Sequence, residues 1–384
     1  MFYEFQKKEN QQKYKELLTI MGNISKLFSK SEIPYLAKKS YWEIFCKSFN
    51  AENLSSYDCS VDAKKGKIGI VLKTWTGENE QKIAEFGKLK KSYQYLNGLN
   101  LCRRISEYRN EPIRVARKLY GIDNMYYHIV KRILNAIQIY ECEIDLINLD
   151  CISINQEDDK NIYFTDGKHK YHFDILNNTL YMLFDSMCKV DEINVEVFEK
   201  PADYLISLFT SNELINSNHS NYKNISSKDK LCLPLYSVGP NGKFVAERSG
   251  LNQWNASGRI RNADELYIPF NKKDREREPD FFPPRDKSFI LHLPDGTEIS
   301  AKVCQEASKN NPLLGKAIMS NPNKILGNWL LREVFELPEY TLVTYEMLEK
   351  FGVDSVIFTK NNDGDYSIDF SKVGTYEQFY DEEE

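Results

Sequence analysis

The sequence predicts two domains, and the N-terminal one has the mixture of helices and strands of an α/β fold. The chain has 384 residues, enough for two cores of ordinary size. Residues 1–210 mix segments of helical period with segments of alternating, β-branched residues. Residues 212–230 are dense in Asn, Ser and Lys, as linkers are. We therefore place the boundary near residue 228, with domains at 1–228 and 229–384.

The predicted N-terminal elements follow from local pattern. Residues 1–30 carry apolar side chains at helical spacing, and Ser40–Cys46 predicts a second helix. Lys67–Trp75 has the β-branched composition of a strand. After a Gly-containing turn, Gln81–Asn97 is rich in Lys and Tyr and is expected to be helical.

The rest of this domain is predicted as one basic helix followed by hairpins. Residues 99–119 are expected to be helical, with an interruption at Asn110–Pro112. Residues 137–150 look hairpin-like. In residues 161–173, Asp166-Gly167 separates two alternating segments, which is a strong hairpin signal.

The composition excludes several classes of protein. Hydrophobic residues make up 41% and charged residues 28%, as in soluble globular chains. We find neither an apolar run of membrane-spanning length nor an N-terminal signal core, and expect a cytoplasmic protein with no membrane contact. Eight scattered cysteines without a Cys-x-x-Cys pair favour free thiols. The net charge of −5 does not exclude a nucleic-acid partner, because binding depends on where the basic residues lie.

An acid followed by a strand that carries a lysine suggests metal-dependent cleavage of DNA. Asp62 precedes the predicted strand, and Lys73 lies near its end. A carboxylate can hold Mg²⁺, which neutralises charge on a phosphate and lowers the pKa of an attacking water. A neighbouring lysine can orient that water or stabilise the developing charge. The simpler interpretation is a turn aspartate beside an ordinary edge strand.

The order of these residues resembles the PD-(D/E)XK nucleases, with one departure. The position two before Lys73 is Val71 rather than an acid. The resemblance to a variant of the family implies that Glu85, on the next predicted helix, replaces it as a metal ligand. Gln81 would share its helix face. Two further acids are candidates: Glu43, in Ser40–Cys46, resembles the extra catalytic acid often carried by the first helix of this fold, and Asp58 is a candidate metal ligand.

A second nuclease chemistry, metal-independent and phospholipase D-like, requires a His-x-Lys motif. The nearest stretch, His169-Lys170-Tyr171-His172, lacks that spacing. His128 precedes Lys131, which is also the wrong interval. This chemistry therefore remains only an alternative.

The stretch from Arg248 to Arg285 has the composition of an irregular arm that could enter a DNA groove. Gly and Asn allow unusual backbone angles, and Arg and Asn can hydrogen-bond base edges. The alternative interpretation is a surface hairpin with a buried tryptophan.

From Leu233 to Phe370 the chain resembles the C-terminal DNA-recognition domain of NgoFVII/BfiI-type restriction endonucleases. The resemblance rests on several motifs in order: Leu233-Pro234-Leu235-Tyr236, Ser249-Gly250-Leu251-Asn252, Tyr267-Ile268-Pro269, Phe282-Pro283-Pro284-Arg285, Leu326-Gly327-Asn328-Trp329-Leu330-Leu331-Arg332 and Asp369-Phe370. It implies a mainly-β pseudobarrel related to the plant B3 fold.

In the family that these motifs resemble, two arms grip the major groove. The first arm corresponds to Phe244–Asn262 and the second to Gln305–Asn323. The residues that the resemblance implies as DNA contacts are Arg248, Ser249, Asn252, Trp254, Asn255, Arg259 and Arg261 in the first arm, and Gln305, Ser308, Lys309, Lys316, Ser320 and Asn321 in the second.

Together these patterns predict a Type II restriction endonuclease that hydrolyses double-stranded DNA with Mg²⁺. Cutting both strands requires two active sites or two successive reactions, so a homodimer is plausible. The resemblance also implies a methyltransferase that protects the same site in the host. The alternatives are a non-catalytic, sequence-specific DNA-binding protein and a nuclease with a different active site.

Overall fold

The computed structural model describes residues 1–55, 60–210, 230–308, 311–362 and 364–381. These residues divide into two compact units, which are described separately. Unit 1 holds residues 1–55, 60–109 and 122–210, and unit 2 holds residues 110–121 and the described residues from 230 onward. The linker expected at 212–230 lies, apart from Lys230, outside the described residues.

Unit 1 contains a six-stranded sheet in the order β1-β2-β3-β5-β6-β11. Strands β3 and β5 are parallel, and the other neighbours are antiparallel. The predicted strand at 67–75 is confirmed as β3. The bounds are β1 Glu52–Asn53, β2 Ala63–Lys65, β3 Ile68–Trp75, β5 Asn124–Ile133, β6 Ala136–Glu143 and β11 Cys188–Asn194.

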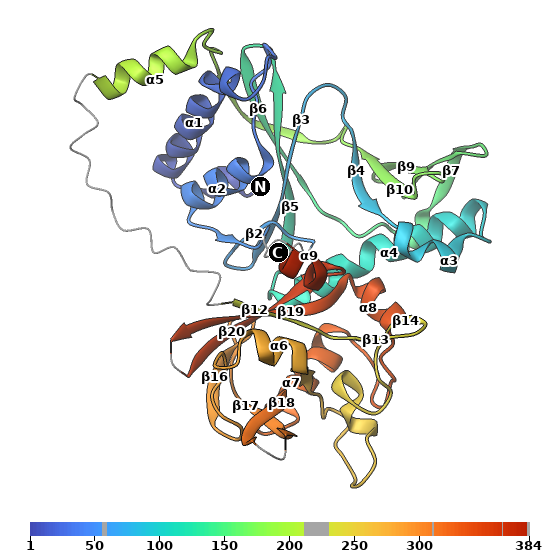
Figure 1. Cartoon of the computed structure of the whole chain (residues 1–384). Helices are drawn as coiled ribbons and strands as arrows, with labels where there is room; N and C mark the ends of the chain where they lie inside the picture. The colour runs from blue at the N-terminus through green and yellow to red at the C-terminus, as the bar shows by residue number, and fades with distance from the viewer. Residues whose placement is uncertain (56–59, 211–229, 309–310, 363, 382–384) are drawn as a thin grey trace. The chain divides into compact units, whose positions relative to one another are not determined.

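Two helices, α1 (Lys8–Asn23) and α2 (Lys38–Phe49), lie on the same side of this sheet (Figure 1). Their buried aromatic side chains, including Tyr14 and Phe45, pack against Ile70 and Leu72 of β3. Short 3-10 helices, η1 (Tyr3–Phe5) and η2 (Ser25–Leu27), flank α1. Because side chains alternate along a strand, Lys73 points to the opposite face from Leu72.

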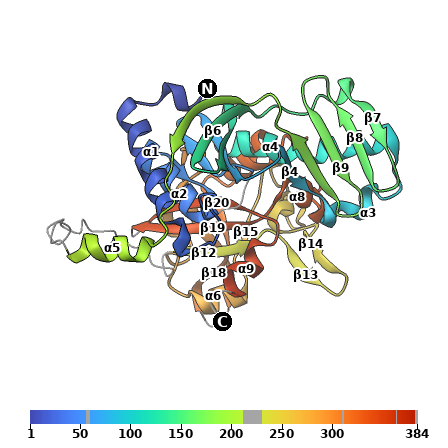
Figure 2. The ribbon, with the colours of Figure 1, turned by 90° about the horizontal axis from the view of Figure 1, so that it is seen from above.

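A second sheet of unit 1 has five antiparallel strands in the order β4-β10-β9-β8-β7. It lies to one side of the larger sheet when unit 1 is seen from above (Figure 2). The predicted hairpin at 161–173 is confirmed as β8 and β9. The bounds are β4 Glu80–Glu85, β7 Ser153–Glu157, β8 Asn161–Thr165, β9 Lys170–Asp174 and β10 Thr179–Leu183, with η5 at Leu149–Cys151.

The helix predicted over Gln81–Asn97 is wrong. Residues Glu80–Glu85 form β4 because they pair with β10, and this tertiary pairing overrides a weak helical propensity. Within the rest of the predicted helix, the structure has two short helices, η4 (Gly87–Leu89) and α3 (Lys90–Tyr93).

The longest helix is α4 (Gly98–Leu119), which continues through Pro112. The predicted interruption at Asn110–Pro112 is therefore wrong. Apolar residues on both sides of the proline are buried, including Ile105 and Leu119, and their packing offsets the lost backbone hydrogen bond. The last described element before the linker is α5 (Pro201–Thr210).

Unit 2 contains a seven-stranded sheet in the order β12-β19-β20-β16-β17-β18-β15. Strands β16 and β20 are parallel and the other neighbours antiparallel. The end strands β12 and β15 approach each other, so the sheet is nearly closed. The bounds are β12 Lys230–Pro234, β15 Ile268–Pro269, β16 Ser288–His292, β17 Glu298–Ser308, β18 Asn311–Ser320, β19 Val353–Asn362 and β20 Asp365–Lys372.

The interior of this sheet is filled by large apolar side chains, among them Leu233, Phe358 and Phe370. Smaller elements complete unit 2: the hairpin β13 (Ser237–Gly239) and β14 (Gly242–Phe244), and the helices η7 (Gly250–Asn255), α6 (Lys272–Arg277), α7 (Ile325–Gly327), η8 (Asn328–Val334), α8 (Tyr345–Phe351) and α9 (Thr375–Asp381). The short helix η8 has π-helical hydrogen bonding.

Candidate functional site

Asp62 lies next to the strand that carries Lys73 in the six-stranded sheet. Asp62 immediately precedes β2, and its backbone N–H donates to the Ile70 carbonyl at 2.9 Å. Its carboxylate Oδ2 accepts the Leu72 N–H at 2.7 Å. Since Ala63 pairs with Ile70, Asp62 stands across the ladder from Val71, the position where an acid was missing from the sequence pattern.

Lys73 is partly buried, and its pKa lies below the usual value for a lysine. Burial is the main factor lowering the pKa of Lys73, to about 8. The Asp62 carboxylate opposes this shift, whereas the positive charges of Lys38 and Lys82 add to it. The Lys73 ammonium donates to the Lys82 carbonyl at 2.8 Å and lies 5.7 Å from the centre of the Tyr127 ring. The structure therefore brings Asp62 and Lys73 into electrostatic contact.

Glu85 and Gln81 do not share a helix face, because they belong to strand β4 of the five-stranded sheet. Glu85 is exposed, and its Oε2 lies 2.9 Å from Lys82 Nζ. Gln81 donates its side-chain amide to the Glu78 carbonyl at 2.9 Å. The Lys73–Lys82 hydrogen bond brings β4 beside β3, and Glu85 lies about 10 Å further along the strand.

The structure says little about the two remaining candidate acids, Glu43 and Asp58. Glu43 is exposed on α2. Asp58 lies outside the described residues, so its place relative to Asp62 is not part of this structure.

Among the described residues, no group of three or more His, Cys, Asp or Glu side chains forms a metal cluster. Mg²⁺ is commonly bound by one or two carboxylates together with water and substrate phosphates. Asp62 supplies a carboxylate, which is a ligand type that Mg²⁺ prefers, and the Leu72 N–H fixes its Oδ2.

The base of the first arm in unit 2 is held by η8. The Arg332 guanidinium donates from Nε to Asp264 Oδ1 at 2.8 Å and from Nη2 to the Ala263 carbonyl at 2.9 Å. A Cβ atom at Gly327 would lie 1.8 Å from the Asp264 carbonyl oxygen, so only glycine fits there. These contacts give structural reasons for Gly327 and Arg332 of the Leu326–Arg332 motif.

Asn252 was expected to contact DNA, but its side chain is fully buried. Its amide donates to the carbonyls of Val343 and Ala246 at 2.9 and 3.1 Å, and its Oδ1 accepts the Val343 N–H at 2.8 Å. The neighbouring Gly250 has a φ of +61°, which favours glycine. The Ser249–Asn252 motif is therefore a structural joint, and the assignment of Asn252 as a DNA contact is corrected.

The other first-arm candidates differ in exposure. Arg248, Ser249 and Asn255 are exposed, although Asn255 donates to the Glu247 carbonyl at 2.9 Å. Trp254 is half-buried, with its ring edge-on to Tyr340 at 5.5 Å. Trp254 therefore supports the arm by packing.

Glu265, which sequence analysis missed, organises the tip of the first arm. Its side chain is fully buried, yet it accepts hydrogen bonds from four residues. Arg259 Nη2 donates to both carboxylate oxygens at 2.6 and 2.8 Å, and Arg261 Nη1 donates to Oε1 at 2.8 Å. Tyr267 Oη and Asn323 Nδ2 each donate at 3.0 Å. An isolated glutamate in a loop gives no signal of such burial.

The second arm lies on β17, β18 and the turn after them. Gln305 is exposed and has a φ of +59°, next to a bulge in β17. Lys316 and Asn321 are exposed, and Ser308 is half-buried. Ser320 is fully buried and accepts the Leu326 N–H at 2.9 Å, so its assignment as a DNA contact is also corrected. Lys309 lies outside the described residues.

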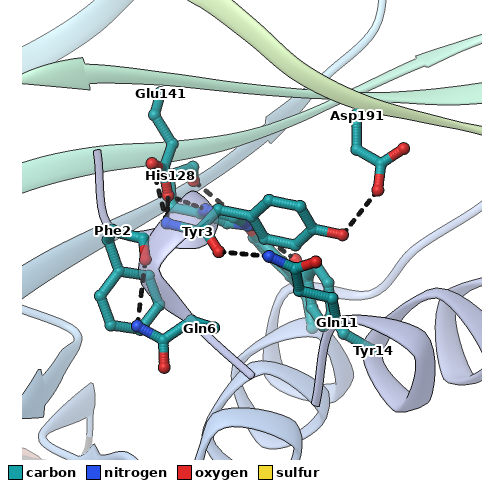
Figure 3. Close-up of polar contacts among 9 residues, drawn as sticks. Phe2, Tyr3, Gln6, Gln11, Tyr14, His128, Glu141 and Asp191 are labelled. Atoms are coloured by element: carbon teal, nitrogen blue, oxygen red, sulfur yellow. Dashed lines mark hydrogen bonds and ion pairs between the residues drawn. The ribbon is translucent and has the colours of Figure 1, made fainter. Parts of the chain in front are cut away.

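Unit 1 contains a buried polar cluster that the sequence did not reveal (Figure 3). His128 Nδ1 lies 2.7 Å from Glu141 Oε1, and both side chains are completely buried. The Tyr3 N–H donates to both Glu141 oxygens at 3.1 Å, and Tyr14 Oη lies 3.0 Å from His128 Nε2. Tyr3 Oη donates to Asp191 at 2.7 Å. Enclosed in the core, the His128–Glu141 pair joins the N-terminal segment and α1 to strands β5 and β6.

The histidines weighed for a phospholipase D-like site have other partners. His169 is buried, with Nε2 3.3 Å from Asp145 Oδ2. His172 is stacked on Tyr163, with ring centres 4.4 Å apart. The geometry of neither residue suggests a nucleophile.

Comparison with known proteins identifies the C-terminal region. Residues 217–362 match the family model of the NgoFVII C-terminal B3-like DNA-binding domain. The nearly closed sheet of unit 2 is consistent with a B3-like pseudobarrel. No curated protein matches the chain. In the described part of the chain, no helix has the length and apolar character needed to cross a membrane. The predicted resemblance is thus confirmed, and the chain carries in residues 217–362 a DNA-binding domain of a restriction-enzyme family.

Proposed function

We propose that the protein is a Type II restriction endonuclease whose unit 1 hydrolyses DNA with Mg²⁺ at a site that includes Asp62 and Lys73. The observation that carries the proposal is that a single chain combines two features. One is a DNA-binding domain of a restriction-enzyme family. The other is the Asp62 carboxylate, bound to the backbone of β3 close to Lys73, whose pKa is lowered. The acid followed by a lysine-bearing strand, Asp62 and then β3, supports the proposal, although strand β4 stands where the PD-(D/E)XK order expects a helix after β3.

Each residue has a defined role in this proposal. Asp62, fixed to β3 by the Leu72 N–H, would hold Mg²⁺. The ion supplies charge neutralisation at the phosphate and lowers the pKa of the attacking water. Lys73, on the strand beside Asp62, would stabilise negative charge on the phosphate oxygens. Glu85 and Gln81 stay predictions as further contributors from β4, and Glu43 and Asp58 stay untested candidates.

The C-terminal domain would select the sequence through its exposed arm residues. Arg248, Ser249 and Asn255 in the first arm, and Gln305, Lys316 and Asn321 in the second, are the accessible candidates. Cleavage of both strands would require two active sites, as a homodimer provides, or two successive reactions. A methyltransferase acting on the same sequence would protect the host.

The test is digestion of unmethylated phage DNA with Mg²⁺ or with EDTA, followed by sequencing of the ends. We expect discrete fragments only with Mg²⁺. Asp62→Asn and Lys73→Met should each lower the cleavage rate by at least about 100-fold, since such groups contribute factors of this size. Both variants should still shift duplex DNA in a gel.

Lys67→Met is the matched control, because Lys67 lies in the adjacent turn, is largely exposed and pairs with Asp123 on the surface. It should cut like the wild type. If both site variants also cut normally, the site lies elsewhere. If the wild type binds specific DNA but never cuts it, the non-catalytic DNA-binding alternative is correct.

A further inference from the structure

The tip of the first arm presents an apolar side chain entirely to solvent. Ile260 is 99% exposed, the highest value among the large hydrophobic side chains of the described residues. It lies between Arg259 and Arg261, two residues after Gly258, whose φ of +103° allows the chain to turn. Single exposed hydrophobic residues are ordinary on protein surfaces, so exposure alone does not indicate a function.

The neighbours of Ile260 make its exposure informative. Both flanking arginines donate to the buried carboxylate of Glu265, which receives five hydrogen bonds from four residues. The Arg261 side chain is only 13% exposed, and its Nε also donates to the Ala256 carbonyl at 3.2 Å. Arg259 Nη1 donates to the Ile260 carbonyl itself at 3.2 Å. The backbone on each side of Ile260 is therefore held in place.

Glu265 is also connected to the second arm. Asn323, which ends that arm, donates to Glu265 Oε2 at 3.0 Å. The adjacent Asp264 is held by Arg332 of η8. Because these bonds exist before DNA arrives, the tip would lose little conformational entropy on binding. If this arm enters the major groove, an outward-facing apolar side chain would meet the apolar group on the base edges there, the thymine methyl.

We propose that Ile260 reads the C5-methyl group of a thymine and that Glu265 is the positioning residue that presents it. The methyl group is the one apolar feature of the base edges in the major groove, and aliphatic side chains recognise it by contact. The proposal rests on sequence-selective DNA binding by this domain. It assigns positioning roles to Arg261, and in part to Arg259, in place of the base contacts expected from the sequence.

The experiment uses the full-length chain in EDTA, so that binding is measured without cleavage. Duplexes are first selected from a random library by the wild type, and each thymine of the selected site is then replaced in turn by deoxyuridine, which lacks only the methyl group. We expect one replacement to weaken wild-type binding by about fourfold, the factor for losing one buried methyl-sized group. Ile260→Ala should bind the thymine and deoxyuridine duplexes equally at that position.

Val238→Ala is the matched control, since Val238 is another largely exposed aliphatic residue of unit 2, on β13. It should keep the full preference for thymine. Glu265→Gln retains the shape of the side chain but removes its charge, and should reduce the thymine preference towards unity. A residue with only a structural role would lower binding to both duplexes and leave their ratio unchanged.

Several results would overturn the proposal. The inference is wrong if the selected site contains no thymine, if no replacement weakens wild-type binding, or if Ile260→Ala keeps the thymine preference. A uniform loss with bent DNA would instead indicate a side chain inserted between base pairs. If the wild type selects no sequence at all, the proposed function fails, and the inference fails with it.

Discussion

Each unit of this protein contains a completely buried glutamate, Glu141 in unit 1 and Glu265 in unit 2. Both join segments that are distant in sequence: Glu141 accepts from Tyr3, 138 residues away, and Glu265 accepts from Asn323, 58 residues away. The partners of Glu141 are a histidine and a backbone N–H inside the core. Those of Glu265 include Arg259, whose side chain is half exposed.

The two glutamates differ in the location of the residues that they hold. Fixing His128 and Tyr3 secures a core that no ligand reaches. Fixing Arg259 and Arg261 secures an exposed loop, the one proposed above to contact DNA. Similar chemistry therefore stabilises a fold in one unit and, under this proposal, pre-organises a binding surface in the other. Changes at the two glutamates should consequently be detected by different measurements.

The largest expected effect is on the stability of unit 1. Glu141→Ala leaves His128 and the Tyr3 N–H without their buried acceptor, and should lower the free energy of unfolding of unit 1 by about 3–5 kcal/mol. Thermal unfolding followed by calorimetry measures this change. Glu143→Ala, at an exposed position two residues along β6, is the control and should have little effect. A normal unfolding temperature for Glu141→Ala would show that the cluster is dispensable.

The second effect concerns the support behind Glu265. Gly327→Ala places a Cβ atom 1.8 Å from the Asp264 carbonyl oxygen, so the backbone at the base of the first arm must move. We expect a loss of about 1–3 kcal/mol in the stability of unit 2, the usual cost of overpacking, and weaker binding to selected DNA. Gly87→Ala, in η4 where an added Cβ would meet no atom within 4 Å, controls for the loss of a glycine. If Gly327→Ala binds DNA like the wild type, the contact between Gly327 and Asp264 does not position the first arm for DNA binding.

The third effect tests whether Lys73 acts through its charge. Its pKa is lowered to about 8, mainly by burial, so it loses its proton as the pH rises through that value. If the ammonium stabilises the transition state, the wild-type kcat/KM should fall about tenfold per pH unit above pH 8. Lys73→Arg stays charged in this range, and whatever activity it keeps should not decline there. A wild-type rate that is flat from pH 7 to 9 would contradict this role.

The smallest effect separates an exposed arm residue from its buried neighbour. Arg248→Ala should weaken DNA binding without altering stability, and should reduce the salt dependence by about one phosphate contact. Asn252→Ala should instead lower stability by about 1–3 kcal/mol, because it leaves the Val343 backbone groups unpaired. If Arg248→Ala binds DNA like the wild type at every salt concentration, the first arm does not contact DNA there.

Sequence reasoning succeeded where local pattern decides the structure. It located β3 from its β-branched composition, the β8–β9 hairpin from alternation around Asp166-Gly167, and the recognition domain from motifs in order. It failed at β4, because pairing with β10, almost 100 residues away, outweighs the helical propensity of Gln81–Glu85.

The candidate sites show the same limit. The sequence could pair Asp62 with Lys73 as candidates because they lie close in sequence, Asp62 just before β2 and Lys73 on the neighbouring strand β3. Glu265 and Glu141 could not, since nothing local distinguishes a buried glutamate from an exposed one. Asn252 and Ser320 were mistaken for DNA contacts because a motif indicates that a residue matters but not whether it faces the solvent.

The close fit of Gly327 against the Asp264 carbonyl has a consequence for engineering this protein. The residues that make the domain recognisable, Gly327 and Arg332, grip the chain below the loop and leave its outer segment, residues 256–262, unconstrained by them. The outward-facing positions of that segment can therefore be varied while the joint beneath it stays intact. Given the DNA contact proposed for Ile260, libraries that vary Ile260 and Asn262 but keep Gly258, Arg259, Arg261 and Glu265 are the most direct way to retarget the domain to other DNA sequences.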